Sequence, residues 1–133
     1  MAKQYNDAQR REYLHMIDRV GLAWLKIFGD DTEFYSTNYW DLLNRLWRNA
    51  KPVRKTDALG FMTAVKSGHT AGKYLERAIE RGFVVETENP DDARSRLVAL
   101  SPEMRSRLDG FFDTAVDEIG QTHGNLADLA EKA

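Results

Sequence analysis

The chain has 133 residues, of which 42% are hydrophobic and 30% are charged, and its formal net charge at pH 7 is −2. This length and composition predict a single soluble domain, residues 1–133, with a true apolar core. The absence of cysteine excludes disulfides, thiolate metal sites and thiol nucleophiles. The polar start and the lack of a long apolar run predict a cytoplasmic protein without a membrane partner.

The N-terminal part of the chain predicts one long amphipathic helix over Asn6–Phe28. Its apolar side chains recur at the 3.6-residue spacing that builds one apolar face, and Gly29 follows as a helix stop. Glu12, His15 and Asp18 lie one turn apart on another face. Because exposed mixed charges at this spacing usually form weak pairs within a helix, we predict surface residues there and no metal ion.

A second helix is predicted over Ser36–Asn49, where Tyr, Trp and Leu side chains form a wide apolar stripe. Lys51–Lys55 should follow as an extended connection, because the residue before a proline avoids helical backbone. This connection is a candidate for a short third strand beside a later hairpin. Thr56 is the predicted cap of a helix over Asp57–Val65, which leads into a tight turn at residues 66–68.

The next predicted helix, Gly68–Arg81, is the most informative element of the chain. Ser67 is a good N-cap and Gly82 suits the left-handed position after the last turn. One face is apolar, and the other carries polar and basic side chains. Its two glycines lower the helix propensity of this segment, so we expect them to serve a close approach of the helix backbone to a partner. The alternative is an ordinary solvated face. The face consists of Gly68, His69, Thr70, Gly72, Lys73 and Arg77.

Two strands are predicted after this helix, Phe83–Glu88 and Arg96–Leu100, joined by a loop with Pro and Asn/Asp turn chemistry. Arg94 and Arg96 lie at the tip and exit of the loop, where arginines are suited to a narrow DNA minor groove. A solvent-exposed hairpin with incidental charge is the alternative. The chain then predicts a helix capped by Ser101, which ends or bends at Gly120, and a last short helix at Asn125–Lys132.

The segment from Ser67 to Leu100 resembles the recognition helix and wing of the MarR family of winged-helix transcriptional regulators. The resemblance depends on the order and spacing of several short features, each common alone. These are Ser67 and Thr70 in the first turn, Leu75 and Ile79 inward, the run Glu80–Val84 at the helix exit, Asp92-x-Arg94-Ser95 in the loop, and Ser101-Pro102 at the next helix.

The resemblance implies a mainly α fold with a small β-hairpin wing, in which a winged helix-turn-helix is flanked by dimerisation helices. The DNA-binding lobe should comprise about residues 36–100, and the dimerisation region about residues 5–30 and 101–133. The expected partners are double-stranded DNA and a second copy of the chain. The expected DNA-binding residues are Ser67, Gly68, His69, Thr70, Gly72, Lys73, Arg77, Arg94 and Arg96, with Asp92 pairing the guanidinium of Arg94.

Family members often respond to small aromatic ligands, so the resemblance also implies an aromatic effector as a further partner. Aromatic residues of the first two helices fall where the two lobes of the family's fold meet. Aromatics at helical spacing are more often core, and a ligand cleft is the alternative interpretation. The candidate cleft residues are Trp24, Tyr39, Trp40 and Trp47.

Charge and catalytic motifs leave two other function classes open. Residues 51–96 hold nine Lys/Arg and seven Asp/Glu, a weak positive balance that fits DNA only if the fold concentrates it on one face. The near-neutral charge favours a winged-helix protein–protein interaction module as an alternative, and a ligand sensor without DNA binding is a third. His15, His69 and His123 fall in different predicted elements, so we expect no enzyme and no cofactor.

Overall fold

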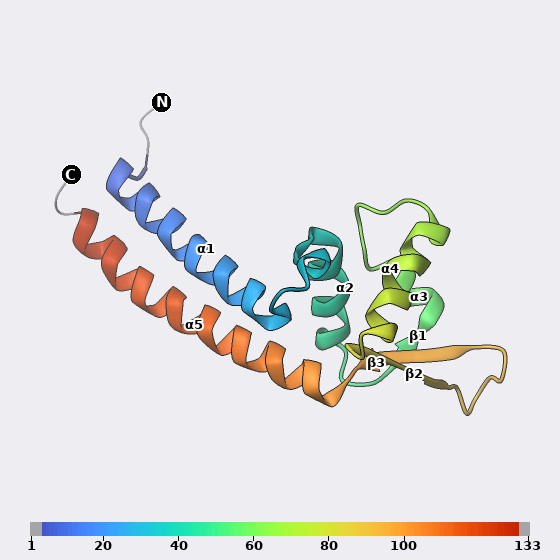
Figure 1. Cartoon of the computed structure of the whole chain (residues 1–133). Helices are drawn as coiled ribbons and strands as arrows, with labels where there is room; N and C mark the ends of the chain where they lie inside the picture. The colour runs from blue at the N-terminus through green and yellow to red at the C-terminus, as the bar shows by residue number, and fades with distance from the viewer. Residues whose placement is uncertain (1–3, 131–133) are drawn as a thin grey trace. The chain divides into compact units, whose positions relative to one another are not determined.

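The structure of the chain is a computed structural model that describes residues 4–130. It is mainly helical with one small antiparallel sheet (Figure 1). Along the described residues the elements follow in the order α1 (Asp7–Phe28), the 3-10 helix η1 (Thr32–Tyr35), α2 (Thr37–Arg48), β1 (Val53–Arg54), α3 (Lys55–Leu59), α4 (Gly68–Glu80), β2 (Val84–Glu88), β3 (Arg96–Leu100) and α5 (Pro102–Ala130).

The contacts divide the chain into two compact units. The helical unit combines the residues up to Asp30 with those from Asp109 onward, and the winged unit comprises Asp31–Leu108. The winged unit therefore extends beyond the lobe predicted over residues 36–100, since it includes η1 and the first turns of α5.

The helical unit is an antiparallel pair formed by α1 and the greater part of α5 (Figure 1). A capping box begins α1: the Asn6 side chain accepts from the Gln9 backbone N–H, and the Gln9 side chain accepts from that of Asn6, both at 2.9 Å. The same two side chains donate to the backbone carbonyls of Leu129 and Leu126 at 3.1 Å. One pair of polar residues thus caps α1 and fixes its register against α5.

The last helix is longer than the sequence predicts. α5 continues from Pro102 to Ala130, so the predicted end at Gly120 and the separate helix from Asn125 are wrong; Lys132 lies outside the described residues. The physical reason is tertiary packing along α1, which offsets the low helix propensity of glycine. Trp24 of α1 packs edge-on against Phe111 of α5, with ring centroids 5.6 Å apart.

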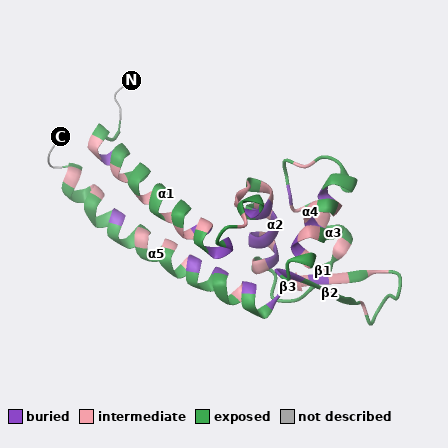
Figure 2. Ribbon diagram, in the orientation of Figure 1, coloured by how far each residue is buried: buried purple, intermediate pink, exposed green. Residues whose placement is uncertain are grey.

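The winged unit is built around a three-stranded antiparallel sheet in the order β1-β3-β2. β1 pairs with β3 at Val53↔Val98, which confirms the predicted third strand, and β2 pairs with β3 from Val84↔Leu100 to Glu88↔Arg96. Figure 2 shows that buried residues of this unit lie on its helices and at the inner end of the sheet. Its fully buried side chains include Phe34, Tyr39, Leu42, Leu43, Met62, Leu75, Val84, Val98, Met104 and Leu108.

The helix before α4 is much shorter than predicted. α3 covers only Lys55–Leu59, so Thr56 is inside the helix and is not its cap, and residues 60–67 form a longer, irregular turn. The reason is a competing contact with α2. The backbone N–H and the hydroxyl of Thr63 both donate to the carboxylate of Asp41, at 3.2 and 2.9 Å, so this N–H is not available to continue a helix.

The two ends of α4 are formed as the sequence predicts. The Ser67 hydroxyl accepts from the Thr70 backbone N–H at 3.4 Å, and Gly82 has a positive φ of 77°. The Phe83 backbone N–H then donates to the Ala78 carbonyl at 3.0 Å, while the Phe83 carbonyl accepts from the Ser101 N–H at 2.9 Å. The backbone of Phe83 therefore joins the end of α4 to the residue that caps α5.

Candidate nucleic-acid interface

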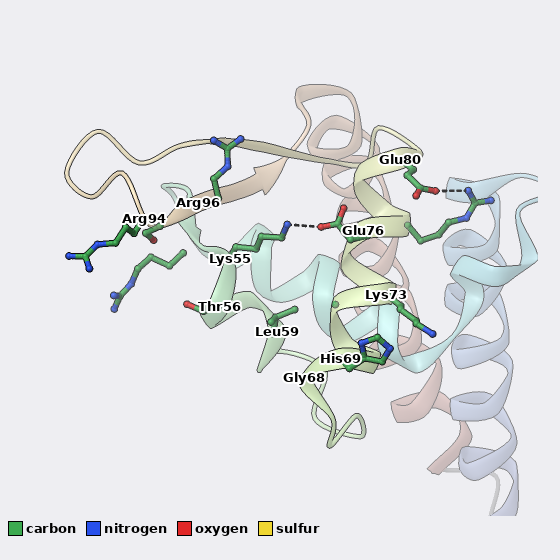
Figure 3. A pocket seen from close by; sticks show the side chains of 14 residues that line it. Lys55, Thr56, Leu59, Gly68, His69, Lys73, Glu76, Glu80, Arg94 and Arg96 are labelled. Atoms are coloured by element: carbon green, nitrogen blue, oxygen red, sulfur yellow. Dashed lines mark hydrogen bonds and ion pairs between the residues drawn. The ribbon is translucent and has the colours of Figure 1, made fainter.

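An open groove of about 790 Å³ lies on the winged unit between α3, α4 and the loop that connects β2 and β3 (Figure 3). We call this loop, with the two strands, the wing. The groove combines residues that are distant in sequence and is formed entirely within the winged unit. It is lined by Arg54, Lys55, Thr56, Leu59, Gly68, His69, Gly72, Lys73, Glu76, Arg77, Glu80, Arg94, Ser95 and Arg96.

The groove concentrates positive charge that the composition of the chain hides. Its lining holds six Lys/Arg and two Glu, whereas the whole chain carries a formal charge of −2. A groove of this sign attracts polyanions, because neighbouring charges of one sign add to a common field. Four of these six cations, Arg54, Lys55, Arg77 and Arg96, pair with carboxylates. Among the described residues, the unpaired positive charge of the groove therefore comes from Lys73 and Arg94.

Most of the predicted DNA-binding residues line this groove. Gly68, His69, Gly72, Lys73, Arg77, Arg94 and Arg96 belong to its lining, whereas Ser67 and Thr70 do not. Ser67 instead caps the helix, and Thr70 lines a neighbouring pocket of about 320 Å³ with Lys73 and Arg77. Among residues 4–130, neither Lys73 nor Arg94 makes an ion pair, so their charges are available to a ligand.

The glycine of the groove face leaves the helix surface open. A Cβ atom built on Gly72 meets no heavy atom within 4 Å, so no neighbour in the chain requires glycine there. His69 and Lys73 lie one helical turn apart beside this opening, and Figure 3 shows both side chains projecting from α4. The combination is a bare backbone patch with two potential donors next to it.

Arg77 is engaged within the protein, which the sequence did not indicate. Its guanidinium donates to both carboxylate oxygens of Glu33 at 2.8–3.1 Å and to Glu80 at 3.2 Å. These hydrogen bonds, first of all those to Glu33, raise the pKa of Arg77, and the same contact lowers the pKa of Glu33. Arg81 pairs with Asp31 in the same region. The role of Arg77 in DNA binding stays a prediction, and in this structure its guanidinium is shared between Glu33 and Glu80.

Lys55 is a groove residue that the sequence analysis missed. Its ammonium lies 2.5 Å from a carboxylate oxygen of Glu76 on α4 and 2.5 Å from one of Glu86 on β2. The contacts with Glu76 and then Glu86 raise the pKa of Lys55, and the contact with Lys55 lowers the pKa of Glu86. Arg96 also pairs with Glu86, at 3.4 Å. Lys55 thus ties the wing to α4.

The loop of the wing uses Asp92 differently from the prediction. The Asp92 carboxylate accepts from the backbone N–H of Arg94 at 3.0 Å, and the Asp92 carbonyl accepts from that of Ser95 at 3.0 Å. Within the described range, the predicted ion pair with the Arg94 guanidinium is not formed. The carboxylate instead shapes the turn, which is the usual role of Asp in a tight loop. The side chain of Arg94 stays exposed at the tip.

The four candidate cleft residues occupy different surroundings. Trp24, in the helical unit, packs on Phe28 and Phe111. In the winged unit, Tyr39 is buried and its hydroxyl donates to the Tyr74 carbonyl at 2.9 Å; burial raises its pKa.

The two remaining candidates are tryptophans of α2. Trp40 is 40% exposed, and the Arg105 guanidinium lies 5.5 Å from the centre of the Trp47 ring. A ligand cleft on the four residues stays a prediction.

Two further searches concern the described residues only. Over residues 4–130, no three His, Cys, Asp or Glu side chains are grouped closely enough to hold a metal ion. In the same range, no helix has the length and apolar character needed to cross a membrane.

Comparison with known proteins supports the fold. No protein-family model matches the chain, and no curated protein matches its sequence. Similar solved structures include the transcriptional regulator Tm0710 from Thermotoga maritima, with 15% identity, a TM-score of 0.62, and 91% of this chain and 82% of that chain covered.

A second similar structure is Sco3205, a MarR family transcriptional regulator from Streptomyces coelicolor in complex with DNA. Its identity is 17% and its TM-score 0.54, and the match covers 92% of this chain and 78% of that chain. A third is BpsR from Bordetella bronchiseptica, whose DNA binding is regulated by 6-hydroxynicotinic acid, with 20% identity, a TM-score of 0.51, and 93% and 86% covered. Each of these matches covers more than nine tenths of this chain. The chain therefore has the winged-helix fold of MarR-type transcriptional regulators.

Proposed function

We propose that this protein is a sequence-specific, DNA-binding transcriptional regulator that acts as a homodimer. The observation that carries the proposal is the basic groove between α4 and the wing, with its six Lys/Arg side chains. In this proposal α4 enters the major groove and the wing reaches the adjacent minor groove. The similarity to Sco3205, which was solved in complex with DNA, supports DNA as the partner.

Within α4, Gly68, His69, Gly72 and Lys73 are the proposed contacts of the major groove. The open surface at Gly72 supports this assignment, because base edges require close approach of a helix. Arg94 is the proposed minor-groove contact, since its guanidinium is exposed and unpaired among the described residues. Asp92 becomes a partner of that guanidinium only if DNA binding reorders the loop.

The proposed homodimer forms through the helical unit. Several large apolar side chains of this unit are exposed to solvent, and contiguous apolar surface usually marks an interface. A twofold pairing would present two α4 helices to two half-sites. The exposed side chains are Tyr5, Tyr13, Leu14, Ile17, Leu22, Val116 and Ile119.

We also propose a small aromatic acid as an effector. The effector of BpsR supports this class of ligand. The test is a thermal melt of the protein with 6-hydroxynicotinic acid and related aromatic acids, followed by tryptophan fluorescence. An upward shift in melting temperature is the expected result, and no shift across the series would remove this part of the proposal.

The decisive experiment is the selection of bound fragments from a random double-stranded DNA library, followed by a salt series on the selected site. We expect one enriched palindromic sequence, and an association constant that falls steeply as salt rises, because each neutralised phosphate releases counterions. A flat salt response without enrichment would contradict DNA binding and favour a winged-helix module that binds protein.

A further inference from the structure

We infer that Glu76 is a specificity-determining residue of α4 that accepts a hydrogen bond from the amino group of a cytosine, and that Lys55 is its positioning residue. This inference rests on the proposed DNA-binding function and names part of its sequence preference. It begins with the place of Glu76 on the groove face, one helical turn after the bare backbone at Gly72.

The carboxylate of Glu76 is anchored through one oxygen only. Oε1 lies 2.5 Å from Nζ of Lys55, and no contact of Oε2 is found within residues 4–130. The side chain is 52% exposed and lines the groove. An ionised carboxylate accepts several hydrogen bonds, so the second oxygen is a fixed and unused acceptor. Figure 3 shows Lys55 directed at Glu76 from the side of the wing.

Lys55 offsets the cost of a negative charge at this place. A lone carboxylate facing DNA is repelled by the phosphates. Here Glu76 and Glu86 share Lys55, and Arg96 also pairs with Glu86, so two carboxylates face two cations. Lys55 is only 28% exposed, and its two short contacts restrict the rotamers of Glu76. The pair therefore presents an oriented acceptor without a net negative charge.

The chemistry of base edges selects the partner. In the major groove guanine presents only acceptors and thymine presents an acceptor and a methyl group, so both reject a carboxylate. Cytosine presents an amino donor, and Glu is among the side chains that accept from it. Adenine presents a donor beside an acceptor, which favours the amide of Gln over a carboxylate. Glu76 should therefore select cytosine at one position of each half-site.

Glu80 is the matched control on the same helix, one turn further along. It also lines the groove, but it lies two turns beyond Gly72, and its partner Arg77, at 3.2 Å, is itself held by Glu33. The Glu80→Gln and Glu76→Gln variants remove the same charge from the same face. A general effect of charge should therefore be equal in both, and base reading should appear in one only.

The test compares sequences selected from a random DNA library by the wild type, Glu76→Gln, Glu80→Gln and Lys55→Met, with circular dichroism melts to verify folding. Glu76→Gln should move the preference at one base pair of each half-site from cytosine to adenine, by roughly fivefold or more. Glu80→Gln should keep the wild-type preference for cytosine at that base pair, whatever its effect on affinity. Lys55→Met should flatten the preference at that same base pair, because the carboxylate is no longer held.

Each other outcome overturns the inference. If Glu76→Gln selects the same sequence as the wild type, Glu76 does not read a base. If Glu80→Gln shows the same shift from cytosine to adenine as Glu76→Gln, the shift is a general effect of charge. An unchanged preference in Lys55→Met would remove the positioning role of Lys55. If the wild type enriches no sequence, the proposed function fails, and this inference fails with it for that separate reason.

Discussion

At the scale of single residues, Glu33 determines how much positive charge α4 presents to a ligand. It binds the guanidinium of Arg77 through both carboxylate oxygens. Both side chains are about two-fifths exposed, so water screens the pair and its contribution to stability is small. In the proposed function, we expect the main effect of the contact to be on binding, since it would keep one arginine of the groove away from phosphate.

The Glu33→Gln variant should bind DNA more tightly than the wild type. A neutral partner releases Arg77 and removes a negative charge from the edge of the groove. We expect a gain of roughly up to fivefold in affinity, measured by fluorescence anisotropy on the selected site. Glu103→Gln breaks a comparable exposed pair with Arg107 outside the groove and should leave affinity unchanged. Weaker binding by Glu33→Gln would show that the pair instead orients Arg77 for DNA.

The Arg94→Ala variant should weaken DNA binding by about 1–3 kcal/mol, the scale of a lost charge-assisted contact. The Arg94 side chain makes no ion pair among residues 4–130, so its removal should leave the melting temperature unchanged. The measurement is a titration of the selected site at two salt concentrations. Arg107→Ala, outside the groove, is the control. Equal affinities of wild type and Arg94→Ala would exclude the wing tip from the interface.

At the scale of elements, α4 carries a glycine that the folded chain does not need. The Gly72→Ala variant should stabilise the free protein by about 0.5–1 kcal/mol, because alanine loses less backbone entropy in a helix. It should also weaken DNA binding by about 1 kcal/mol or more, since the methyl group fills the space of close approach. Denaturant melts and anisotropy titrations measure the two effects.

Gly110→Ala is the matched control for this change. Gly110 lies inside α5, and a Cβ there also meets no heavy atom within 4 Å. It should stabilise the protein without changing DNA affinity. A Gly72→Ala protein that binds DNA as tightly as the wild type would contradict close approach at this turn.

The elements themselves were largely predictable, because their ends are set by local chemistry. Ser67 and Gly82 limit α4, and Asn6 caps α1, each through contacts within a few residues. The predicted helix ends were wrong where a contact between residues distant in sequence sets the length of the helix. α3 is short because Asp41 takes the Thr63 N–H across 22 positions of sequence, and α5 is continuous because α1 packs along it.

The position of the candidate site on α4 and the wing was predictable, but the ion pairs of its cations were not. Glycines, His69 and Lys73 of α4 were identified from helical spacing, and they line the groove. The state of Arg77 depends on Glu33, 44 positions away, and the role of Lys55 depends on Glu76, 21 positions away. No periodicity in the sequence reports which carboxylate meets which cation, because this depends on tertiary structure.

At the scale of the whole molecule, the exposed apolar surface of the helical unit supports the proposed pairing of two chains. We expect light scattering after gel filtration to give twice the 15.3 kDa mass of the chain. The double variant Leu14→Glu/Ile119→Glu should be monomeric and retain its helical circular dichroism, because both side chains are exposed in the single chain. Buried charges without partners would prevent association.

Val85→Glu is the control for this prediction, since Val85 is also an exposed apolar residue but belongs to β2 of the winged unit. It should remain dimeric. A wild-type protein that is monomeric at all accessible concentrations would contradict the homodimer, and an unchanged mass of the double variant would move the interface to other residues.

The backbone of Phe83 has one further consequence. Its N–H and its carbonyl close the end of α4 and hold the start of α5, and neither contact involves a side chain. Side chains on the groove face can therefore be exchanged without loosening this junction, provided that Gly82 keeps its backbone conformation. The groove-face side chains proposed to contact DNA are thus separate from the backbone hydrogen bonds that join α4 to α5. This separation makes α4 suitable for re-engineering toward other base sequences.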